Sequence, residues 1–175
     1  MRRILLAALG TILAVSLATA AETEIKLSDF KVVAKQKDAP AELVGFNDGD
    51  NKIFMYVLAT ATAEFEAKEE SVYKFNIELS GDMGKKDKAK FKLTIGGKEI
   101  EKEFELKQND AKVYTFKAEL KKGKQKIELE FLNDEFKEGE YDSNFYIHAV
   151  KFEATKEKLD EKKPEEKKPA EKADK

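Results

Sequence analysis

One loop of the chain carries residues whose types and spacing suit metal binding. It lies in "FLNDEFKEGEYDSNFYIHAVKF", residues 131–152, between two segments of alternating apolar residues. Calcium takes six to eight oxygen ligands from carboxylates, amide and backbone carbonyls and water. The candidate ligands are Asn133, Asp134, Asp142 and Asn144. Composition alone favours a solvated acidic turn, so a calcium cage and a plain turn both remain open.

A second acidic loop, "FNDGDN" at residues 46–51, is predicted to be a plain turn. Its oxygen-bearing residues do not follow the order of a helix-loop-helix calcium site. Asn, Asp and Gly are also common turn residues, because Asx side chains bond the local backbone and all three accept left-handed conformations.

The residue types give little support to an enzyme. The chain has no cysteine and one histidine, His148, and it lacks Gly-x-Ser-x-Gly, His-Glu-x-x-His and phosphate-binding glycine loops. Paired carboxylates hydrolyse glycosides in some enzymes, but acids are so frequent here that no pair stands out. We predict a non-enzyme, in which His148 is a strand residue bonded to a partner or to solvent.

The segments that must position the loop alternate polar and apolar residues, which predicts half-buried strands. The pattern covers "VYKFNIELS" (72–80), "FKLTI" (91–95), "VYTFKAEL" (113–120), "KIELEF" (126–131) and "NFYIHAVKFEA" (144–154). The pair Gly96-Gly97 predicts a hairpin turn between 91–95 and "KEIEKEFEL" (98–106). No part of this region shows sustained helical periodicity, so we expect an antiparallel sandwich or barrel.

The earlier strands are less regular. We expect "EIKLSDFKVVA" (24–34) to be the first strand. The β-rich segment 51–67 is expected to hold two strands with a bend between them. Residues 37–51, which include Pro40 and Gly49, are expected to be mostly loop.

The two ends of the chain differ from its middle. "MRRILLAALGTILAVSLATA" has the basic start, apolar run and small-residue end of a secretory signal peptide, so residues 1–20 are predicted to be a signal peptide. We therefore expect a secreted or periplasmic protein without a membrane span after cleavage. Residues 21–154 are expected to form one domain. Residues 155–175 hold eight lysines, seven acids and two prolines, so we expect a disordered tail, with contact to an envelope partner as the sharper alternative. The balance of 33 basic and 35 acidic residues gives no nucleic-acid signature.

The segment "KKGKQKIELEFLNDEF…YDSNFYIHAVKFE" resembles the C-terminal half of the calcium-dependent xylan-binding carbohydrate-binding modules. That family shows Phe-x-Asn-Asp, a variable loop, Asp-Arg-Asn-Leu and a closing strand. The resemblance implies an all-β, antiparallel β-sandwich of jelly-roll type. It implies that Asn133, Asp134, Asp142 and Asn144 hold calcium, and that the calcium binds vicinal hydroxyls of a xylan-like polysaccharide. Tyr141, as a weak stacking residue, and Asp142 are the expected carbohydrate contacts.

The chain departs from this pattern at several positions. Ser143 stands where the family has Arg, and His148 falls where it often has Asp. The chain has no Trp, the strongest sugar-stacking residue. The alternative is an envelope structural or interaction protein that keeps the sandwich without binding sugar, in which Asn133 and Asp134 pin a strand-exit turn. The other loop acids, Glu135, Glu138 and Glu140, are expected to be solvated.

Overall fold

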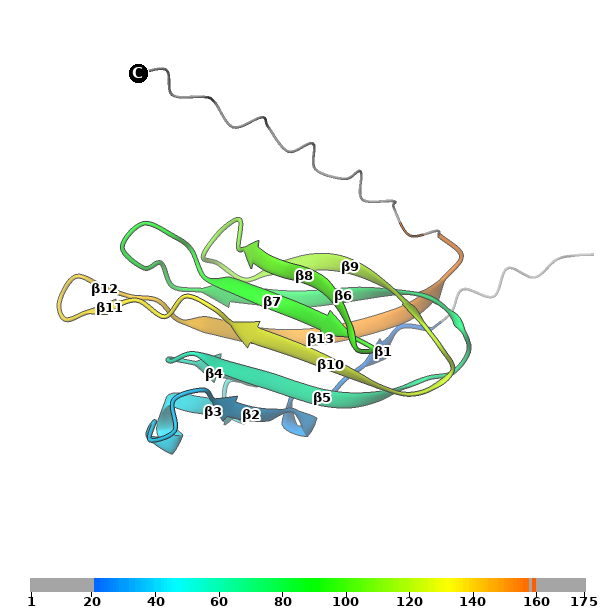
Figure 1. Ribbon diagram of the computed structural model, residues 1–175, viewed down its shortest axis with the longest axis horizontal. Helices are drawn as coiled ribbons and strands as arrows, with labels where there is room; N and C mark the ends of the chain where they lie inside the picture. Colours follow the sequence, from blue (N-terminus) through cyan, green and yellow to red (C-terminus); the bar gives the residue numbers. More distant parts are fainter. Residues whose placement is uncertain (1–20, 158, 160–175) are drawn as a thin grey trace, which may run out of the picture.

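The computed structural model describes residues 21–157 and residue 159, in which two antiparallel sheets pack face to face (Figure 1). The first sheet contains β1 (Thr23–Glu24), β3 (Val44–Asn47), β4 (Lys52–Met55), β6 (Ser71–Gly81), β9 (Lys112–Leu120) and β13 (Phe145–Thr155). The second contains β2 (Lys31–Ala34), β5 (Ala59–Ala67), β7 (Lys90–Ile95), β8 (Lys98–Glu105) and β10 (Gly123–Phe131). The strand orders are β3-β4-β13-β6-β9, with β1 paired to β13, and β2-β5-β10-β7-β8. The predicted antiparallel sandwich of jelly-roll type is confirmed.

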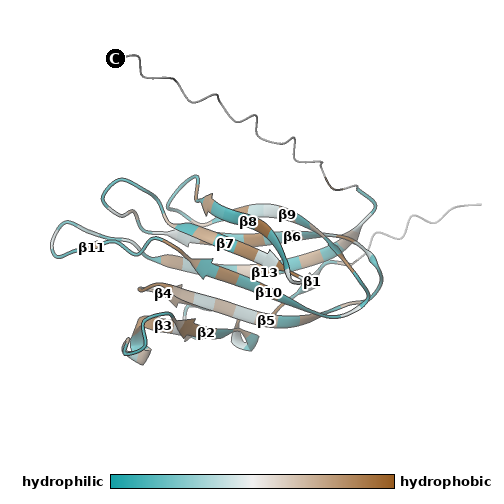
Figure 2. Cartoon of the chain, viewed as in Figure 1, coloured by the Kyte–Doolittle hydropathy of each residue, from teal (hydrophilic) through white to brown (hydrophobic). Residues whose placement is uncertain are grey.

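The predicted alternation gives the sandwich its core. Polar and apolar residues alternate along the central strands (Figure 2), and the apolar set of each strand faces the other sheet. In β6, Phe75, Ile77 and Leu79 are fully buried, while the residues between them are partly exposed. Since side chains in a strand point alternately to its two faces, this pattern fixes which face of each strand is buried.

The turn between β7 and β8 agrees with the prediction. Gly96 and Gly97 have φ angles of 58° and 75°, the left-handed values that a tight hairpin turn needs at both central positions. The predicted bend in residues 51–67 is also confirmed, because β4 belongs to the first sheet and β5 to the second.

The N-terminal part differs from the predicted single strand over 24–34. The chain changes sheets there: β1 pairs with β13, the short 3-10 helix η1 (Leu27–Asp29) follows, and β2 pairs with β5. The alternation breaks at this 3-10 helix, because the buried residues Leu27 and Phe30 are three positions apart.

The prediction of mostly loop over 37–51 is wrong for β3, which follows the 3-10 helix η2 (Ala41–Leu43). β3 is a four-residue strand that is defined by its pairing with β4. Its own sequence shows no alternation of polar and apolar residues long enough to predict a strand. The turn prediction for residues 46–51 holds after Phe46 and Asn47, which end β3. Asn47 Oδ1 accepts a hydrogen bond from the Asp50 N–H at 3.2 Å.

Residues 1–20, the predicted signal peptide, and most of the predicted tail, residues 158 and 160–175, lie outside the described part of the chain. β13 continues to Thr155, one residue beyond the predicted domain end. In the described part, no helix has the length and apolar character to cross a membrane.

Candidate functional site

The loop between β10 and β13 folds as a small hairpin at one end of the sandwich (Figure 1). Its strands β11 (Phe136–Lys137) and β12 (Tyr141–Asp142) pair with Phe136 opposite Asp142. The Ser143 N–H then donates to the Glu135 carbonyl at 2.8 Å, which continues the same register toward the base. Asp134 and Asn144 are the next residues on the two sides of the hairpin. Burial raises the pKa of Asp134, and Asp142 is close enough for its carboxylate to raise that pKa further. The hairpin therefore gathers Asp134, Asp142 and Asn144, which the sequence separates.

The base of the hairpin is anchored in the aromatic core. Phe145, the first residue of β13, is fully buried and stacks on Phe91 at 5.3 Å and on Phe131 at 5.8 Å between ring centroids. These rings come from β13, β7 and β10, so both sheets hold the residue that follows Asn144. The site is thus built on rigid strands, which lowers the entropy cost of ordering its ligands.

Asn144 is held by Asp82, which follows β6. Asn144 Nδ2 donates to Asp82 Oδ2 at 3.0 Å, and the Asp82 N–H donates to the Asn144 carbonyl at 3.0 Å. Asn144 is 6% exposed, and its other amide atom, Oδ1, is buried without a hydrogen-bond partner among the described residues. A buried oxygen without a partner is costly, so this atom calls for a donor or a cation.

Ser143, the departure from the family pattern, has the same property. It is fully buried, and its Oγ has no hydrogen-bond partner in the described part of the chain. A buried position of this kind does not accommodate an unpaired arginine, so the small residue is consistent with its surroundings. Two neighbouring residues thus each carry a buried oxygen that no described group satisfies.

The two aspartates of the hairpin interact unfavourably. Burial, together with the carboxylate of Asp142, raises the pKa of Asp134 above its ordinary value. Two carboxylates that disfavour each other's charge form a site that a cation stabilises, because the cation favours both ionised forms.

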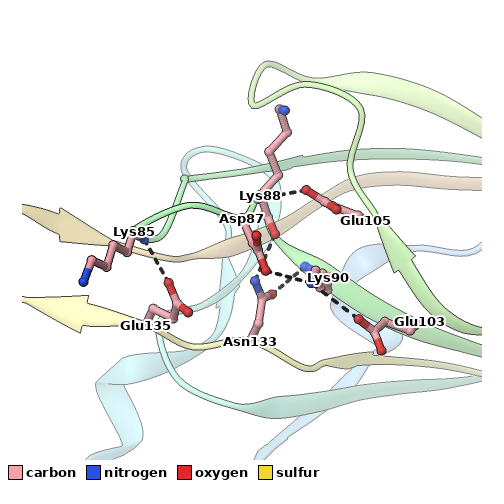
Figure 3. A network of polar contacts seen from close by, with 8 residues as sticks. All are labelled: Lys85, Asp87, Lys88, Lys90, Glu103, Glu105, Asn133 and Glu135. Atoms are coloured by element: carbon pink, nitrogen blue, oxygen red, sulfur yellow. Dashed lines mark hydrogen bonds and ion pairs between the residues drawn. The ribbon is translucent and has the colours of Figure 1, made fainter. Parts of the chain in front are cut away.

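Asn133, a predicted ligand, has a structural role of its own. Its Oδ1 accepts a hydrogen bond from the Lys90 N–H at 2.6 Å, and its Nδ2 donates to the Lys88 carbonyl at 2.9 Å (Figure 3). Both ends of the amide are therefore bonded to the backbone leading into β7. Asn133 positions its neighbour Asp134, and the structure gives it the role of a bridge between two loops.

The prediction that Glu135 is solvated is wrong. Glu135 Oε2 accepts a hydrogen bond from the Lys85 N–H at 2.9 Å, which ties the hairpin to the loop between β6 and β7 (Figure 3). Glu138 and Glu140 are exposed, as expected, and Glu140 forms an ion pair with Lys137 across the hairpin turn. The expectation missed Glu135 because its partner is 50 residues away in the sequence.

The site has few charged side chains that could bind a metal ion. No group of three or more His, Cys, Asp or Glu side chains in the described part of the chain is placed to hold a metal. Asp134, Asp142 and Asn144 Oδ1 would supply only part of the oxygen shell that calcium takes. Backbone carbonyls, the Ser143 hydroxyl, water or ligand hydroxyls would complete it.

Three residues near the site were not predicted. Asp82 orients Asn144, and Tyr146 Oη donates to the same Asp82 oxygen at 2.9 Å. Phe136 is 69% exposed and lies opposite Asp142 in the hairpin. Phe136 could have been singled out from the sequence, because it is an aromatic residue within an acidic loop. The predicted Tyr141 is half-buried in β12, next to Asp142.

Comparison with known proteins gives a family match. Residues 74–166 match the family model CBM60, described as a Ca-dependent carbohydrate-binding module, xylan-binding. No curated protein matches the chain.

Solved structures share the fold. A family 35 carbohydrate binding module from Clostridium thermocellum is 12% identical, with a TM-score of 0.54 over 78% of this chain and 100% of that one. The CBM36-1 domain of a multidomain xylanase from the hindgut metagenome of Trinervitermes trinervoides is 17% identical, with a TM-score of 0.54 over 77% and 98%. A CBM36 module in complex with calcium and xylotriose is 15% identical, with a TM-score of 0.50 over 77% and 99%. On the family match and this shared sandwich, the chain belongs to the family of Ca-dependent xylan-binding carbohydrate-binding modules.

Proposed function

We propose that this protein is an exported, non-catalytic module that binds a xylan-type polysaccharide through a calcium ion at the base of the hairpin. One observation carries the proposal: Asn144 Oδ1 is buried, without a partner among the described residues, in the same small hairpin base as Asp134 and Asp142. A hard cation satisfies this oxygen and both carboxylates together. A plain solvated turn would leave the oxygen buried and unpaired.

Each residue has a distinct part in this site. Asp134 and Asp142 supply the negative charge, and Asn144 supplies a neutral oxygen whose direction Asp82 fixes. Asn133 and Glu135 hold the hairpin against the loop before β7. When bound, calcium supplies coordination positions for two adjacent sugar hydroxyls, and their spacing must fit its coordination distances, which selects among sugar stereochemistries.

An aromatic side chain stands beside the proposed site. Phe136 and Asp142 are directly opposite each other in the hairpin, so their side chains lie on the same face of the ribbon. Phe136 is 69% exposed, unlike the aromatic residues of the core. A sugar ring whose hydroxyls meet the ion would then lay an apolar C–H face against Phe136. Phe136 thus takes the part that a Trp would otherwise play. Tyr141 pairs with Lys137, and its side chain points to the other face of the ribbon.

Titration calorimetry tests the proposal directly. We expect the protein to take up calcium, to bind xylan-type oligosaccharides in calcium, and to lose that binding in excess chelator. Asp142→Asn should weaken both events. The matched control is Glu138→Gln, which removes the same charge from an exposed position of the hairpin. Absence of calcium uptake, or equal losses in the two variants, would contradict the proposal.

A further inference from the structure

The solvent face of the first sheet carries aromatic side chains close to the hairpin. Phe54 lies on β4, Tyr56 follows it, and Tyr146 and His148 lie on β13. The ring centroids are 5.0 Å apart for Phe54–Tyr56, 6.1 Å for Tyr56–Tyr146 and 6.5 Å for Tyr146–His148. We call these four residues the aromatic face. Phe54 and Tyr146 are opposite each other in the paired strands, so the rings stand on one surface.

His148 lies on the same face of β13 as Tyr146, and a β-bulge at this point brings Ala149 to that face as well. Ile147 pairs with Leu79 and Ala149 with the preceding residue of β6, Glu78, so His148 is the extra residue of β13. His148 and Ala149 therefore both face solvent, while Val150 returns to the core. Bulges of this kind redirect side chains and are frequent at functional sites. The His148 Nε2 is 2.7 Å from Ser80 Oγ, which agrees with the prediction of a bonded strand histidine.

Polar groups surround Tyr146: a carboxylate bonds the hydroxyl at its edge, and a lysine ammonium lies over its face. Tyr146 Oη donates to Asp82 Oδ2 at 2.9 Å, and Lys52 Nζ is 5.2 Å from the centroid of the Tyr146 ring. The same Asp82 oxygen accepts the hydrogen bond from Asn144. Asp82 thus joins the aromatic face directly to the base of the hairpin, and the two form one continuous surface.

The surface continues past the aromatic face along β13. A hollow of about 320 Å³ is lined by Glu22, Asn76, Glu78, Val113, Ala149 and Lys151. Since a strand rises about 3.3 Å per residue, the distance along β13 from Tyr146 to Lys151 is about 17 Å. A ligand that starts at the hairpin and follows β13 therefore meets aromatic rings first and a polar hollow afterwards.

We propose that the aromatic face binds further sugar units of a polysaccharide chain. One unit of that same chain is held at the hairpin. This rests on the proposed function. A linear xylan-type chain offers alternating C–H faces and hydroxyls. They match the exposed ring of Tyr56 beside the half-buried rings of Phe54 and Tyr146 and the polar groups around Tyr146.

A second copy of the protein fits this surface less well. Among the described residues, Tyr56, at 37%, is the one member of the aromatic face that counts as an exposed large apolar side chain. Stable interfaces between proteins bury about 800 Å² on each partner around an apolar centre, and a single exposed tyrosine does not provide that centre. Tyr146 is also already partnered by Asp82 and Lys52, and His148 by Ser80.

The test compares a long ligand with a short one. Binding of xylohexaose and xylobiose to the full-length protein is measured in calcium, together with backbone amide NMR shifts. We expect Tyr56→Ala to weaken xylohexaose binding about fivefold, as expected for the loss of one stacking contact, and to leave xylobiose binding and calcium uptake unchanged. Tyr56→Phe, which keeps the ring, should retain the affinity. The matched control is Val33→Ala, an exposed apolar residue of the second sheet.

The outcomes separate this inference from the proposed function. Shifts confined to the hairpin, or a Tyr56→Ala variant that binds xylohexaose as tightly as the parent, would overturn the aromatic face and leave the calcium site standing. Shifts at Tyr56 and Tyr146 that persist in chelator, without calcium uptake, would support the aromatic face and overturn the calcium site. A dimer in sedimentation that Tyr56→Ala dissociates would overturn the aromatic face in favour of a second copy of the chain.

Discussion

Asn144 and Asp82 bond to each other in both directions: Asn144 Nδ2 donates to Asp82 Oδ2 at 3.0 Å, and the Asp82 N–H donates to the Asn144 carbonyl at 3.0 Å. This pair joins the end of β6 to the start of β13. It also decides which amide atom of Asn144 is left free, because the nitrogen is committed to Asp82. The oxygen then remains buried and available.

Removal of Asp82 should therefore disorder the amide of Asn144. We expect Asp82→Ala to lower calcium affinity about tenfold or more, since groups that orient a metal ligand commonly contribute that much. Titration calorimetry with calcium measures the effect. Asp87→Ala is the control, because Asp87 lies in the same loop and pairs with Lys90 instead. Equal calcium affinity in Asp82→Ala and the parent would show that Asp82 does not position the site.

Asp134 should destabilise the calcium-free protein. Burial and the Asp142 carboxylate raise its pKa, so folding is favoured where Asp134 is protonated and loses that contribution as pH rises through the raised pKa. We expect the melting temperature in chelator to be higher for Asp134→Asn than for the parent at pH 7. In calcium the order should reverse, because a site filled at 100 times its dissociation constant adds about 2.7 kcal/mol to the parent alone. The same order in chelator and in calcium would argue against a cation at Asp134.

Phe136 should matter for sugar and not for the fold. Its side chain is 69% exposed, so Phe136→Ala removes almost no buried surface, and we expect unchanged melting and calcium uptake. If a sugar stacks there, affinity for xylan-type oligosaccharides should fall by about 1 kcal/mol or roughly fivefold. Calorimetry in saturating calcium measures it. Met83→Ala, another exposed residue of the neighbouring loop, is the control.

Gly81 is required by the packing beneath the site. A Cβ at this position would come within 2.6 Å of Ala89 Cβ and 2.7 Å of the Asn144 carbonyl oxygen. We expect Gly81→Ala to lower the free energy of unfolding by about 1–3 kcal/mol, as overpacking does, and to shift Asn144. Gly49→Ala, whose nearest neighbour would be 3.4 Å away, should leave stability almost unchanged. Denaturant unfolding compares the free energies of unfolding of the two variants. Equal values would show that β6 and β13 can move apart to accommodate the added methyl group at little cost.

The strands of the central region were predictable because each carries its own alternation. The N-terminal crossing was not, since it depends on pairing with β13 and β5, which lie far along the chain. β3 was missed because it is short and is defined by its pairing with the neighbouring strand β4. At the site, the family pattern pointed to Asp134, Asp142 and Asn144, and the hairpin gathers them. The role of Asn133 as a bridge and the part of Asp82 depend on contacts across 43 and 62 residues, which local sequence does not encode.

The single histidine gives the protein a pH signature of its own. Burial lowers the pKa of His148, with Lys52 acting in the same direction and Glu78 opposing it. The unfolded chain therefore takes up a proton before the folded one, and stability present above about pH 6.5 is lost as pH falls through the lowered pKa. Asp134 titrates with the opposite sign, so the measurement needs Asp134→Asn as background.

In that background, we expect the melting temperature to fall as the pH drops below about 6.5, the ordinary pKa of histidine, and His148→Gln to flatten this step. Gln keeps a hydrogen-bonding group near Ser80 Oγ but does not titrate. A step that survives His148→Gln would assign the loss to carboxylates. A flat profile in the Asp134→Asn variant would mean that His148 has the same pKa in the folded and unfolded chains, so that burial of its ring does not affect its titration.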